Sequence, residues 1–310
     1  MKKISVVVSV FNEENNLADC LESVRGLADE VIVVDNSSTD KTAAIARQYT
    51  NKVFVKPNLA MLNKNKNFGF EKATGDWILN LDGDERVTPA LSAEMSSHLR
   101  GVPPRRRATS EERLPVGYEM PRQNIIFGKW IQHGLWWPDY QLRLFQRNKG
   151  KFPCQHVHEK IKVQGETAKL TSPLLHHNYQ TVSQFIQKMD RIYTEDEVKG
   201  LRQRGQKVYW YDAIRMPARD FLSVFFAREG FKDGLHGLVL ALLQSFYALV
   251  VFAKIWEKQG FPPSQEKEFL KAVAKEFKQM GAELHHWLIN SWTKEGKWWQ
   301  RFSKSFFGRF

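Results

Sequence analysis

The stretch Trp77-Ile78-Leu79-Asn80-Leu81-Asp82-Gly83-Asp84-Glu85 joins an apolar run to three carboxylates within four residues. The apolar part is typical of a buried strand. Asp82 and Asp84 are two residues apart, so on an extended backbone their side chains point to the same side. Such carboxylates repel each other unless a cation lies between them, and Mg²⁺ is usually held by one or two carboxylates together with substrate phosphates. A solvated acidic turn is the alternative, because Asp and Gly favour turns.

The sequence upstream repeats this pattern of an apolar run followed by polar residues. The apolar runs alternate with segments of helical periodicity, which is typical of βαβ units and a mostly parallel sheet. In such sheets ligands bind outside the carboxyl ends of the strands. We therefore expect residues 11–14, 35–40 and 82–85 to converge on one crevice. The expected strands are residues 3–10, 31–34, 52–55 and 76–81, and the expected helices are residues 17–24, 41–49 and 67–74.

Three segments of this part of the chain carry a resemblance to a known family. They are Val8-Ser9-Val10-Phe11-Asn12-Glu13-Glu14, Val33-Val34-Asp35-Asn36-Ser37-Ser38-Thr39-Asp40 and Leu81-Asp82-Gly83-Asp84-Glu85. In order and spacing they resemble the N-terminal part of the inverting nucleotide-sugar glycosyltransferases, a large family with the Asp-x-Asp motif. The resemblance implies an α/β fold of the GT-A (Rossmann-like) type. A mostly parallel sheet would be flanked by helices, followed by a C-terminal helical extension.

A narrower resemblance lies further along the chain. Residues 137–145 and 157–159 are similar to the branch that contains the bacterial lipopolysaccharide-core β-1,4-glucosyltransferases, and parts of residues 219–238 are similar to its C-terminal extension. The whole resemblance spans roughly residues 1–260. It implies a hexosyltransferase that uses a nucleotide-sugar donor, with UDP and glucose favoured. The acceptor would be a glycan or a glycolipid.

The resemblance also implies roles for residues of the expected crevice. Asp35 would accept a hydrogen bond from the uracil ring, and Phe11, Asn12 and Glu13 would line the nucleoside. Lys66 would reach the diphosphate. Its Asn-Lys-Asn-Lys-Asn surroundings depart from the family's usual Gln-Lys/Arg-Asn, so a surface lysine is the alternative.

A divalent metal, Mg²⁺ or Mn²⁺, is the expected cofactor. Asp84 would hold it with Asp82 nearby, where Asp82 also borders the donor, and the metal would offset the charge of the leaving diphosphate. His158 would complete the metal's ligand shell or orient the acceptor. His176 and His177 are further candidates for the same roles, with a purely structural role as the alternative for each histidine.

An inverting displacement needs one base within hydrogen-bond reach of the acceptor hydroxyl. Glu159 is the first candidate, because the relatives place their acidic base at this point in the chain order. Asp139 is the second candidate. A salt bridge from Glu159 to Arg143 or Arg147 is the structural alternative.

Two other functions remain open from the sequence. A sugar nucleotidyltransferase would need a Gly-rich basic phosphate loop after the first strand, whereas residues 11–14 are acidic and lack glycine. A non-catalytic scaffold that binds a sugar nucleotide or a membrane is the second alternative. The intact acidic triplet and the intact pair His158-Glu159 argue against it.

The chain of 310 residues has room for one large α/β domain and an appendage. We expect a catalytic domain at residues 1–198, with a flexible Pro- and Arg-rich loop at about 101–115, and a basic helical extension at 199–310. The two cysteines, Cys20 and Cys154, make no disulfide framework, so a reducing cytoplasmic setting is expected.

The formal net charge is +12, and residues 199–310 hold nineteen Lys and Arg against ten Asp and Glu. The pattern matches no nucleic-acid-binding module, so we expect an anionic membrane surface as partner and no nucleic acid. The apolar run 235–256 falls short of a clean spanning segment. The tail 298–310 interleaves aromatics with cations, as interfacial anchors do. We expect a peripheral protein at the inner face of the cell membrane, with packing of both segments on the catalytic domain as the alternative.

Overall fold

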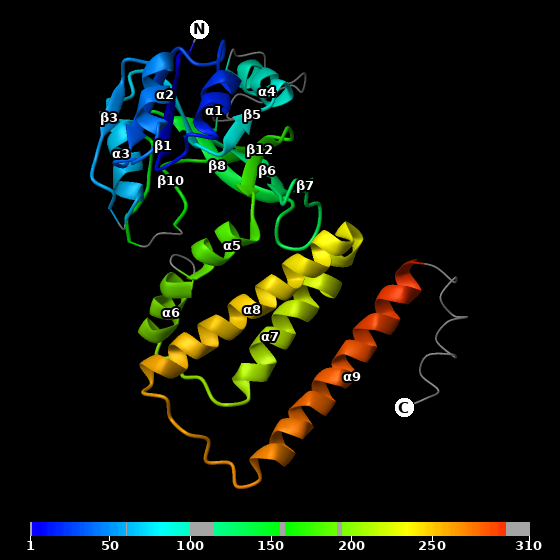
Figure 1. Ribbon diagram of the computed structural model, residues 1–310. Helices are drawn as coiled ribbons and strands as arrows, with labels where there is room; N and C mark the ends of the chain where they lie inside the picture. Colours follow the sequence, from blue (N-terminus) through cyan, green and yellow to red (C-terminus); the bar gives the residue numbers. More distant parts are fainter. Residues whose placement is uncertain (1, 60, 100–114, 156–158, 191–193, 296–310) are drawn as a thin grey trace. The chain divides into compact units, whose positions relative to one another are not determined.

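The computed structural model describes residues 2–59, 61–99, 115–155, 159–190 and 194–295 (Figure 1). His158, the tail 298–310 and nearly all of the expected loop at 101–115 lie outside the described residues. The chain divides into two compact units. Unit 1 comprises residues 1–130 and 136–180, and unit 2 comprises residues 131–135 and 181–310. The expected boundary between a catalytic domain and a helical extension at residue 198 stays a prediction.

Unit 1 is built on a mixed sheet, whose first half is parallel as expected. In the described part of the chain the strand order is β3-β2-β1-β4-β8-β6-β12-β5, with β7 and β11 beside β6. The parallel half consists of β1 (Ile4–Val10), β2 (Glu30–Asp35), β3 (Val53–Val55) and β4 (Trp77–Asp82). The other half contains β5 (Glu85–Val87), β6 (Gly117–Ile126), β7 (Lys129–Trp130), β8 (Asp139–Gln146), β11 (Thr167–Lys169) and β12 (Leu174–Tyr179). A separate short pair joins β9 (Gly150–Lys151) and β10 (Lys162–Val163).

Helices cover both faces of this sheet, which is why β1 is buried along its whole length. The helices α1 (Leu17–Ser23), α2 (Thr42–Tyr49) and α4 (Pro89–Leu99) contribute to one apolar core, and α3 (Asn63–Lys72) contributes to the other. Successive residues of β1 alternate between the two cores, with Val6 and Val8 in the first and Val7 in the second. The expected fold class, a sheet flanked by helices with a helical C-terminal region, is confirmed.

One element begins earlier than the sequence predicts. The helix expected at residues 67–74 starts at Asn63, within an Asn-rich run of weak helix propensity. Tertiary hydrogen bonds compensate for this weakness. The buried Asn65 amide donates to Asn36 Oδ1 over 2.5 Å and to the Pro57 carbonyl over 2.9 Å, and Asn63 donates to Glu159 over 3.2 Å.

Unit 2 is helical in its described residues, as expected for the C-terminal extension. Its helix α8 is long and apolar enough to cross a membrane by length and composition alone. The buried Asp233 carboxylate accepts hydrogen bonds from the backbone amides of Gln132 and His133 and so ties residues 131–135 to this unit. The elements are α5 (Val182–Lys188), α6 (Thr194–Gln203), α7 (Asp212–Leu222), the π-helical turn η2 (Ser223–Ala227), the 3₁₀ turn η3 (Gly230–Asp233), α8 (Leu235–Lys258) and α9 (Phe269–Glu295).

A contact between two glycines sets the start of α8. A Cβ atom added at Gly237 would lie 1.8 Å from the Gly230 carbonyl oxygen of η3, far inside van der Waals contact. Backbone atoms cannot move aside as a flexible side chain can. The close packing of η3 on α8 therefore requires glycine at position 237.

We predict that Gly237→Ala destabilises unit 2, because the added methyl group forces η3 and α8 apart. Overpacking of this kind costs about 1–3 kcal/mol. Urea unfolding of the full chain, followed by far-UV circular dichroism, measures the loss. The control is Gly281→Ala in α9, where an added Cβ meets no atom within 4 Å and the higher helix propensity of Ala adds up to about 1 kcal/mol. Equal stability of the two variants would contradict the packing argument.

Candidate active site

The loops that follow β1 and β2 are joined by hydrogen bonds at the carboxyl edge of the sheet. The Asn12 amide donates to Ser38 Oγ over 2.9 Å, and the Thr39 amide donates to Asn12 Oδ1 over 2.8 Å. The Glu13 amide donates to Thr42 Oγ1 over 2.8 Å. Asn12 has a φ of 54° in the left-handed region, which Asn tolerates better than most residues. The two loops therefore form one rigid edge.

The residues expected to line a nucleoside lie along this edge. Asp35 ends β2, is 1% exposed, and accepts a hydrogen bond from the Ser38 amide over 3.2 Å. The buried Asn36 amide donates to the Val10 carbonyl over 2.7 Å, which fixes the end of β2 against β1. Phe11 is exposed, so its ring is open to solvent at this edge.

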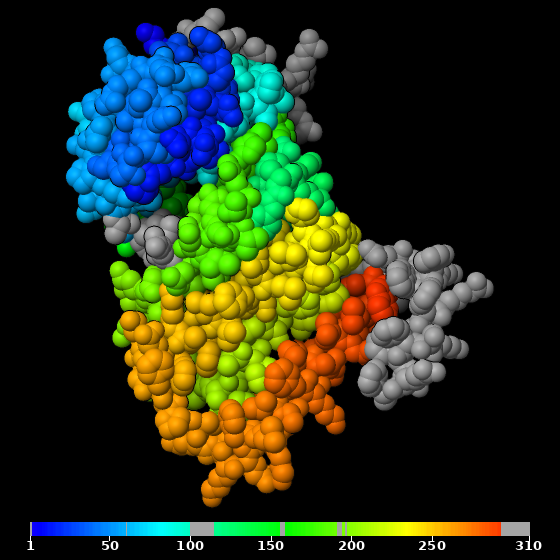
Figure 2. All heavy atoms as spheres, in the orientation of Figure 1, coloured from blue at the N-terminus to red at the C-terminus, as the bar shows by residue number. Residues whose placement is uncertain are grey.

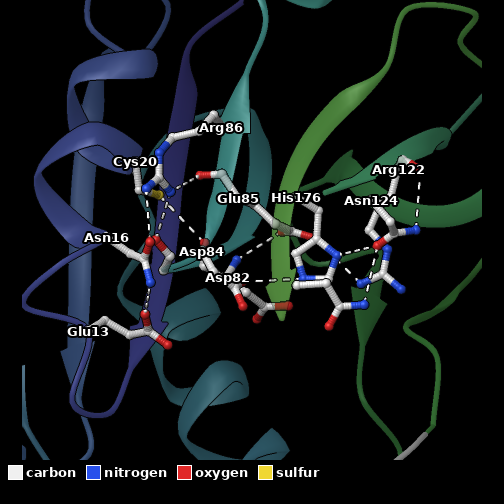
Figure 3. A network of polar contacts seen from close by, with 12 residues as sticks. Glu13, Asn16, Cys20, Asp82, Asp84, Glu85, Arg86, Arg122, Asn124 and His176 are labelled. Carbon is white, nitrogen blue, oxygen red and sulfur yellow. Dashed lines mark hydrogen bonds and ion pairs between the residues drawn. The ribbon is translucent and has the colours of Figure 1, made fainter. Parts of the chain in front are cut away.

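The acidic turn after β4 packs against the first of these loops. A Cβ atom at Gly83 would lie 3.0 Å from the side-chain atoms Glu13 Cγ and Val10 Cγ1, so the turn packs tightly on the side chains at the end of β1. Asn16 accepts a hydrogen bond from Arg86 over 3.3 Å and donates one to Glu13 over 2.8 Å (Figure 3). The three polar segments thus meet at one edge, as the sheet topology predicts.

Asp82 is held by two cations rather than standing free for a metal. Lys66 Nζ lies 2.5 Å from Asp82 Oδ1, and Arg143 Nη2 lies 2.6 Å from Asp82 Oδ2 and 2.6 Å from Glu85 Oε1. Burial alone would raise the pKa of Asp82, but Arg143 and Lys66 outweigh it and hold the pKa well below its usual range. The Lys66 side chain is 15% exposed, so it is no surface lysine.

Asp84 turns toward β12 instead. Its Oδ1 lies 3.5 Å from Nε2 of His176, whose Nδ1 is 2.7 Å from Asn124 Oδ1 of β6 (Figure 3). The antiparallel register of β5 and β12 places His176 opposite Glu85 and so next to the acidic turn. No cluster of three or more His, Cys, Asp or Glu side chains able to hold a metal occurs among the described residues.

The donor atoms around Asp84 fit a divalent ion that takes most of its ligands from phosphate and water. A carboxylate and an imidazole supply two ligands, and Mg²⁺ bound to phosphates takes only one or two protein carboxylates and leaves its other positions to phosphate oxygens and water. The protein side of such a site would consist of Asp84 and His176, with Asp82 close in sequence but engaged by cations.

The two candidate bases have different surroundings. Glu159 accepts hydrogen bonds from the backbone amides of Cys154 and Gln155, the latter over 2.9 Å, and from Asn63. Asp139 is paired with Arg122 and accepts from Gln141 over 2.7 Å. Burial raises the pKa of Asp139, whereas Arg122 and the Gln141 bond lower it by more, so its pKa lies below its usual range.

The two candidate bases differ in their relation to a cavity of about 280 Å³. Glu159 lines it together with Lys66 and Asp82, whereas Asp139 is absent from its described lining. The other lining residues are Asn63, Arg122, Gln141, Leu142, Arg143, Phe152, Lys160 and Ile161.

Several residues of this site were not singled out by their sequence. Arg143 was considered only as a partner of Glu159, yet it pairs with Asp82 and Glu85. Arg122, which pairs with Asp139 and lies 3.8 Å from Glu85, was missed. Arg143 carries a usable signal, because it is a charged residue inside the short apolar run that Leu142, Leu144 and Phe145 form in β8. Such a buried cation needs an acidic partner.

Comparison with known proteins shows the class of the protein. Residues 5–114 match the family model described as Glycosyl transferase family 2. The chain is a glycosyltransferase of the GT-A type, with this domain in its N-terminal part. The expected enzyme class is confirmed over the nucleotidyltransferase and scaffold alternatives.

Similar proteins extend the match beyond that domain. The chain is 29% identical over 264 residues to the lipopolysaccharide core biosynthesis glycosyltransferase LpsC of Rhizobium meliloti, covering 83% of this chain and 93% of LpsC. It is 27% identical over 266 residues to the uncharacterized glycosyltransferase RT0209 of Rickettsia typhi, covering 83% of this chain and 88% of RT0209. Among solved structures it is similar to residues 1–349 of TarS from S. aureus, with 17% identity, coverage of 83% and 92%, and a TM-score of 0.40.

We predict that Arg143→Met destabilises unit 1 by up to about 3–5 kcal/mol, because it removes the guanidinium group that Asp82 shares with the fully buried Glu85. Asp82 then keeps only Lys66, and Glu85 keeps only its longer contact with Arg122. Urea unfolding at neutral pH measures the loss. Arg25→Met is the control, since Arg25 forms an exposed pair with Glu22 that is worth about 0–1 kcal/mol.

The same comparison has a predicted pH dependence. The pKa of Asp82 is lowered in the folded state, so its pair with Arg143 stabilises the protein above the unfolded pKa of about 3.9 and loses this effect as the pH falls. The difference between wild type and Arg143→Met should therefore shrink on acidification. A difference that stays constant from neutral to acid pH would contradict the assignment.

Proposed function

We propose that the protein is an inverting glycosyltransferase that moves a sugar, with glucose favoured, from a UDP-sugar to a lipid-linked or lipopolysaccharide-core acceptor. The observation that carries this proposal is the cavity that Lys66, Asp82 and Glu159 line together. It combines a cation for a diphosphate, the acidic turn and a carboxylate for the acceptor. The similarity to LpsC supports the class of acceptor.

The donor would bind along the carboxyl edge of the parallel strands. The uracil ring would contact Asp35, and the nucleoside would lie beside Phe11, Asn12 and Glu13, whose loop is already fixed by hydrogen bonds to the loop after β2. Lys66 would reach the diphosphate from α3. Because Lys66 pairs with Asp82 without a ligand, an arriving diphosphate would compete with that carboxylate for the ammonium group.

A divalent ion, Mg²⁺ or Mn²⁺, would complete the donor site. Asp84 and His176 are the side chains placed to hold it, with Asp82 nearby and His158 outside the described residues. Bound there, the ion would supply positive charge for the leaving diphosphate. Lys66 and Arg122 would provide further positive charge from the lining of the cavity that contains Asp82 and Glu159.

Glu159 would take the proton of the acceptor hydroxyl. It lines the cavity with Asp82, whereas the carboxylate of Asp139 is engaged by Arg122 and Gln141. The amides of Cys154 and Gln155 hold the Glu159 carboxylate in place. Asp139 is the second candidate for the base.

We also propose that the enzyme works at the cytoplasmic face of the cell membrane as a peripheral protein. The excess of Lys and Arg after residue 199 supports attraction to anionic lipid. The lipopolysaccharide function in the name of the relative LpsC supports a place at the cell envelope.

We predict that Asp84→Asn removes most activity and lowers Mn²⁺-dependent UDP affinity at least about tenfold, which is 1.4 kcal/mol. The substitution takes one negative charge and one strong ligand from the proposed site. Titration calorimetry with UDP, with and without Mn²⁺, measures the effect. Asp19→Asn is the control, because the Asp19 side chain is 79% exposed. Unchanged metal-dependent UDP affinity in Asp84→Asn would refute the metal assignment.

Glu159→Gln should separate binding from chemistry, because an amide keeps the size of the side chain but cannot accept the proton. Transfer should fall by about two to four orders of magnitude, while UDP affinity is retained. The matched variant is Asp139→Asn, and a panel of UDP-, GDP- and dTDP-sugars identifies the donor. If Asp139→Asn abolishes transfer and Glu159→Gln does not, then Asp139 is the base.

A further inference from the structure

The helix α8 presents an apolar face to solvent along its whole length. Its outward residues recur at spacings of three, four or seven, so they lie on one side of the helix. Part of α8, coloured from yellow to orange, lies at the surface drawn in Figure 2. The large apolar residues on it, each between 37% and 72% exposed, are Leu235, Leu242, Phe246, Leu249 and Trp256.

The opposite side of α8 is apolar as well. It is buried within unit 2, where Leu240, Val251 and Ile255 are fully or almost fully covered. From residue 235 to residue 253 the helix contains no Asp, Glu, Lys or Arg. A helix that is apolar around its whole circumference is found in a protein core or in contact with lipid. One side of α8 is buried in the core of unit 2, and the outward side is not.

We propose that this outward face of α8 is the surface by which the protein docks on a lipid bilayer, with the helix lying in the plane of the membrane interface. This proposal rests on the peripheral membrane location proposed above, which also gives the side of the membrane, the cytoplasmic one. The apolar face of α8 would contact the bilayer, in addition to the attraction between basic residues and anionic headgroups.

The ends of the face carry the residues that membrane interfaces favour. At its C-terminal end Trp256 and the exposed Phe261 contact each other edge to face, with ring centroids 4.9 Å apart. Trp is enriched at the boundary between hydrocarbon and headgroups. Exposed lysines flank the helix, with Lys232 before its start and Lys258 at its last turn. Their long side chains can reach headgroups while the helix contacts acyl chains.

The neighbours of α8 favour a helix in the membrane plane over a spanning one. The helix α7 packs along α8, and Ser245 of α8 donates to the Pro217 carbonyl of α7 over 2.9 Å. On α7 the side chains of Arg215 and Arg219 are 52% and 74% exposed. A spanning α8 would bring these guanidinium groups into hydrocarbon, which is costly. An α8 at the interface leaves them in water.

The test is co-sedimentation of the full chain with vesicles made of equal parts of phosphatidylglycerol and phosphatidylcholine, at low and high salt. Wild type should retain part of its binding at high salt, because salt does not screen the apolar contact. Phe246→Glu should lower the partition coefficient between vesicles and water about tenfold or more. Phe246→Leu, which keeps an apolar side chain, should bind as wild type does. Val182→Glu is the matched control, since Val182 is 47% and Phe246 46% exposed, and it should bind as wild type does.

Several results would overturn the proposal. If Phe246→Glu has a wild-type circular dichroism spectrum and binds vesicles as wild type does, the face does not contact lipid. If its spectrum shows that the variant is misfolded, Leu242→Asn is tested in its place. A wild-type dimer that Phe246→Glu dissociates in sedimentation equilibrium would assign the face to a second copy. Membrane-bound protein released by detergent but not by alkaline carbonate would show a spanning helix.

Donor hydrolysis in solution, measured on the same variants, keeps the two proposals apart. Hydrolysis of UDP-sugars should be equal in wild type and Phe246→Glu, because the substitution lies outside the catalytic unit. If no variant hydrolyses a nucleotide sugar while vesicle binding behaves as expected, the proposed catalytic function fails and the docking surface stands.

Discussion

A single buried guanidinium group organises the candidate active site. Arg143 of β8 contacts the carboxylates of Asp82 and Glu85, which stand on either side of the turn between β4 and β5. Glu85 is fully buried and also accepts a hydrogen bond from the Asp82 amide over 3.0 Å. Charges buried in this way are retained only where their mutual geometry offsets the lost solvation. Lys66 and Arg122 extend the network to α3 and β6, so the shape of the acidic turn depends on both halves of the sheet.

This network has consequences for the chemistry proposed at the site. Acidic and basic side chains line the same cavity, so the proposed diphosphate would meet cations already in place instead of residues that must move in. Asp84 is not among the Arg143 contacts and lies beside His176, and this carboxylate and imidazole are the pair proposed to hold a divalent ion. The two carboxylates of the Asp-x-Asp motif therefore have different partners, although they stand two residues apart in the sequence.

Unit 2 is organised by packing instead of charge. The contact between Gly230 and Gly237 brings η3 against the first turn of α8, and the inner side of α8 is buried beneath its neighbours. Because the outer side is equally apolar, the helix has two apolar faces and only one of them is covered by the described residues. This imbalance is the physical basis for assigning the second face to lipid.

The sequence by itself determined those features that depend on near neighbours along the chain. The β-branched runs, the alternation of strands with helices and the polar turns at the strand ends predicted a parallel sheet in this part of the chain, and these strands pair in parallel. The same topology predicted that the residues around Asp35, Glu13 and Asp82 meet at one edge. Local periodicity carries this information because side-chain direction repeats every two residues in a strand and every 3.6 in a helix.

Only the tertiary structure decided which charged groups are partners. Asp82 and Arg143 are 61 residues apart in the chain, and Glu159 and Asn63 are 96 apart. No local pattern encodes such pairs, because they arise when separate strands and loops are brought side by side. The early start of α3 has the same origin, since its asparagines are held by hydrogen bonds to distant residues. The apolar run of α8 was visible in the sequence, but which of its sides is buried was decided by the packing of α7 against it.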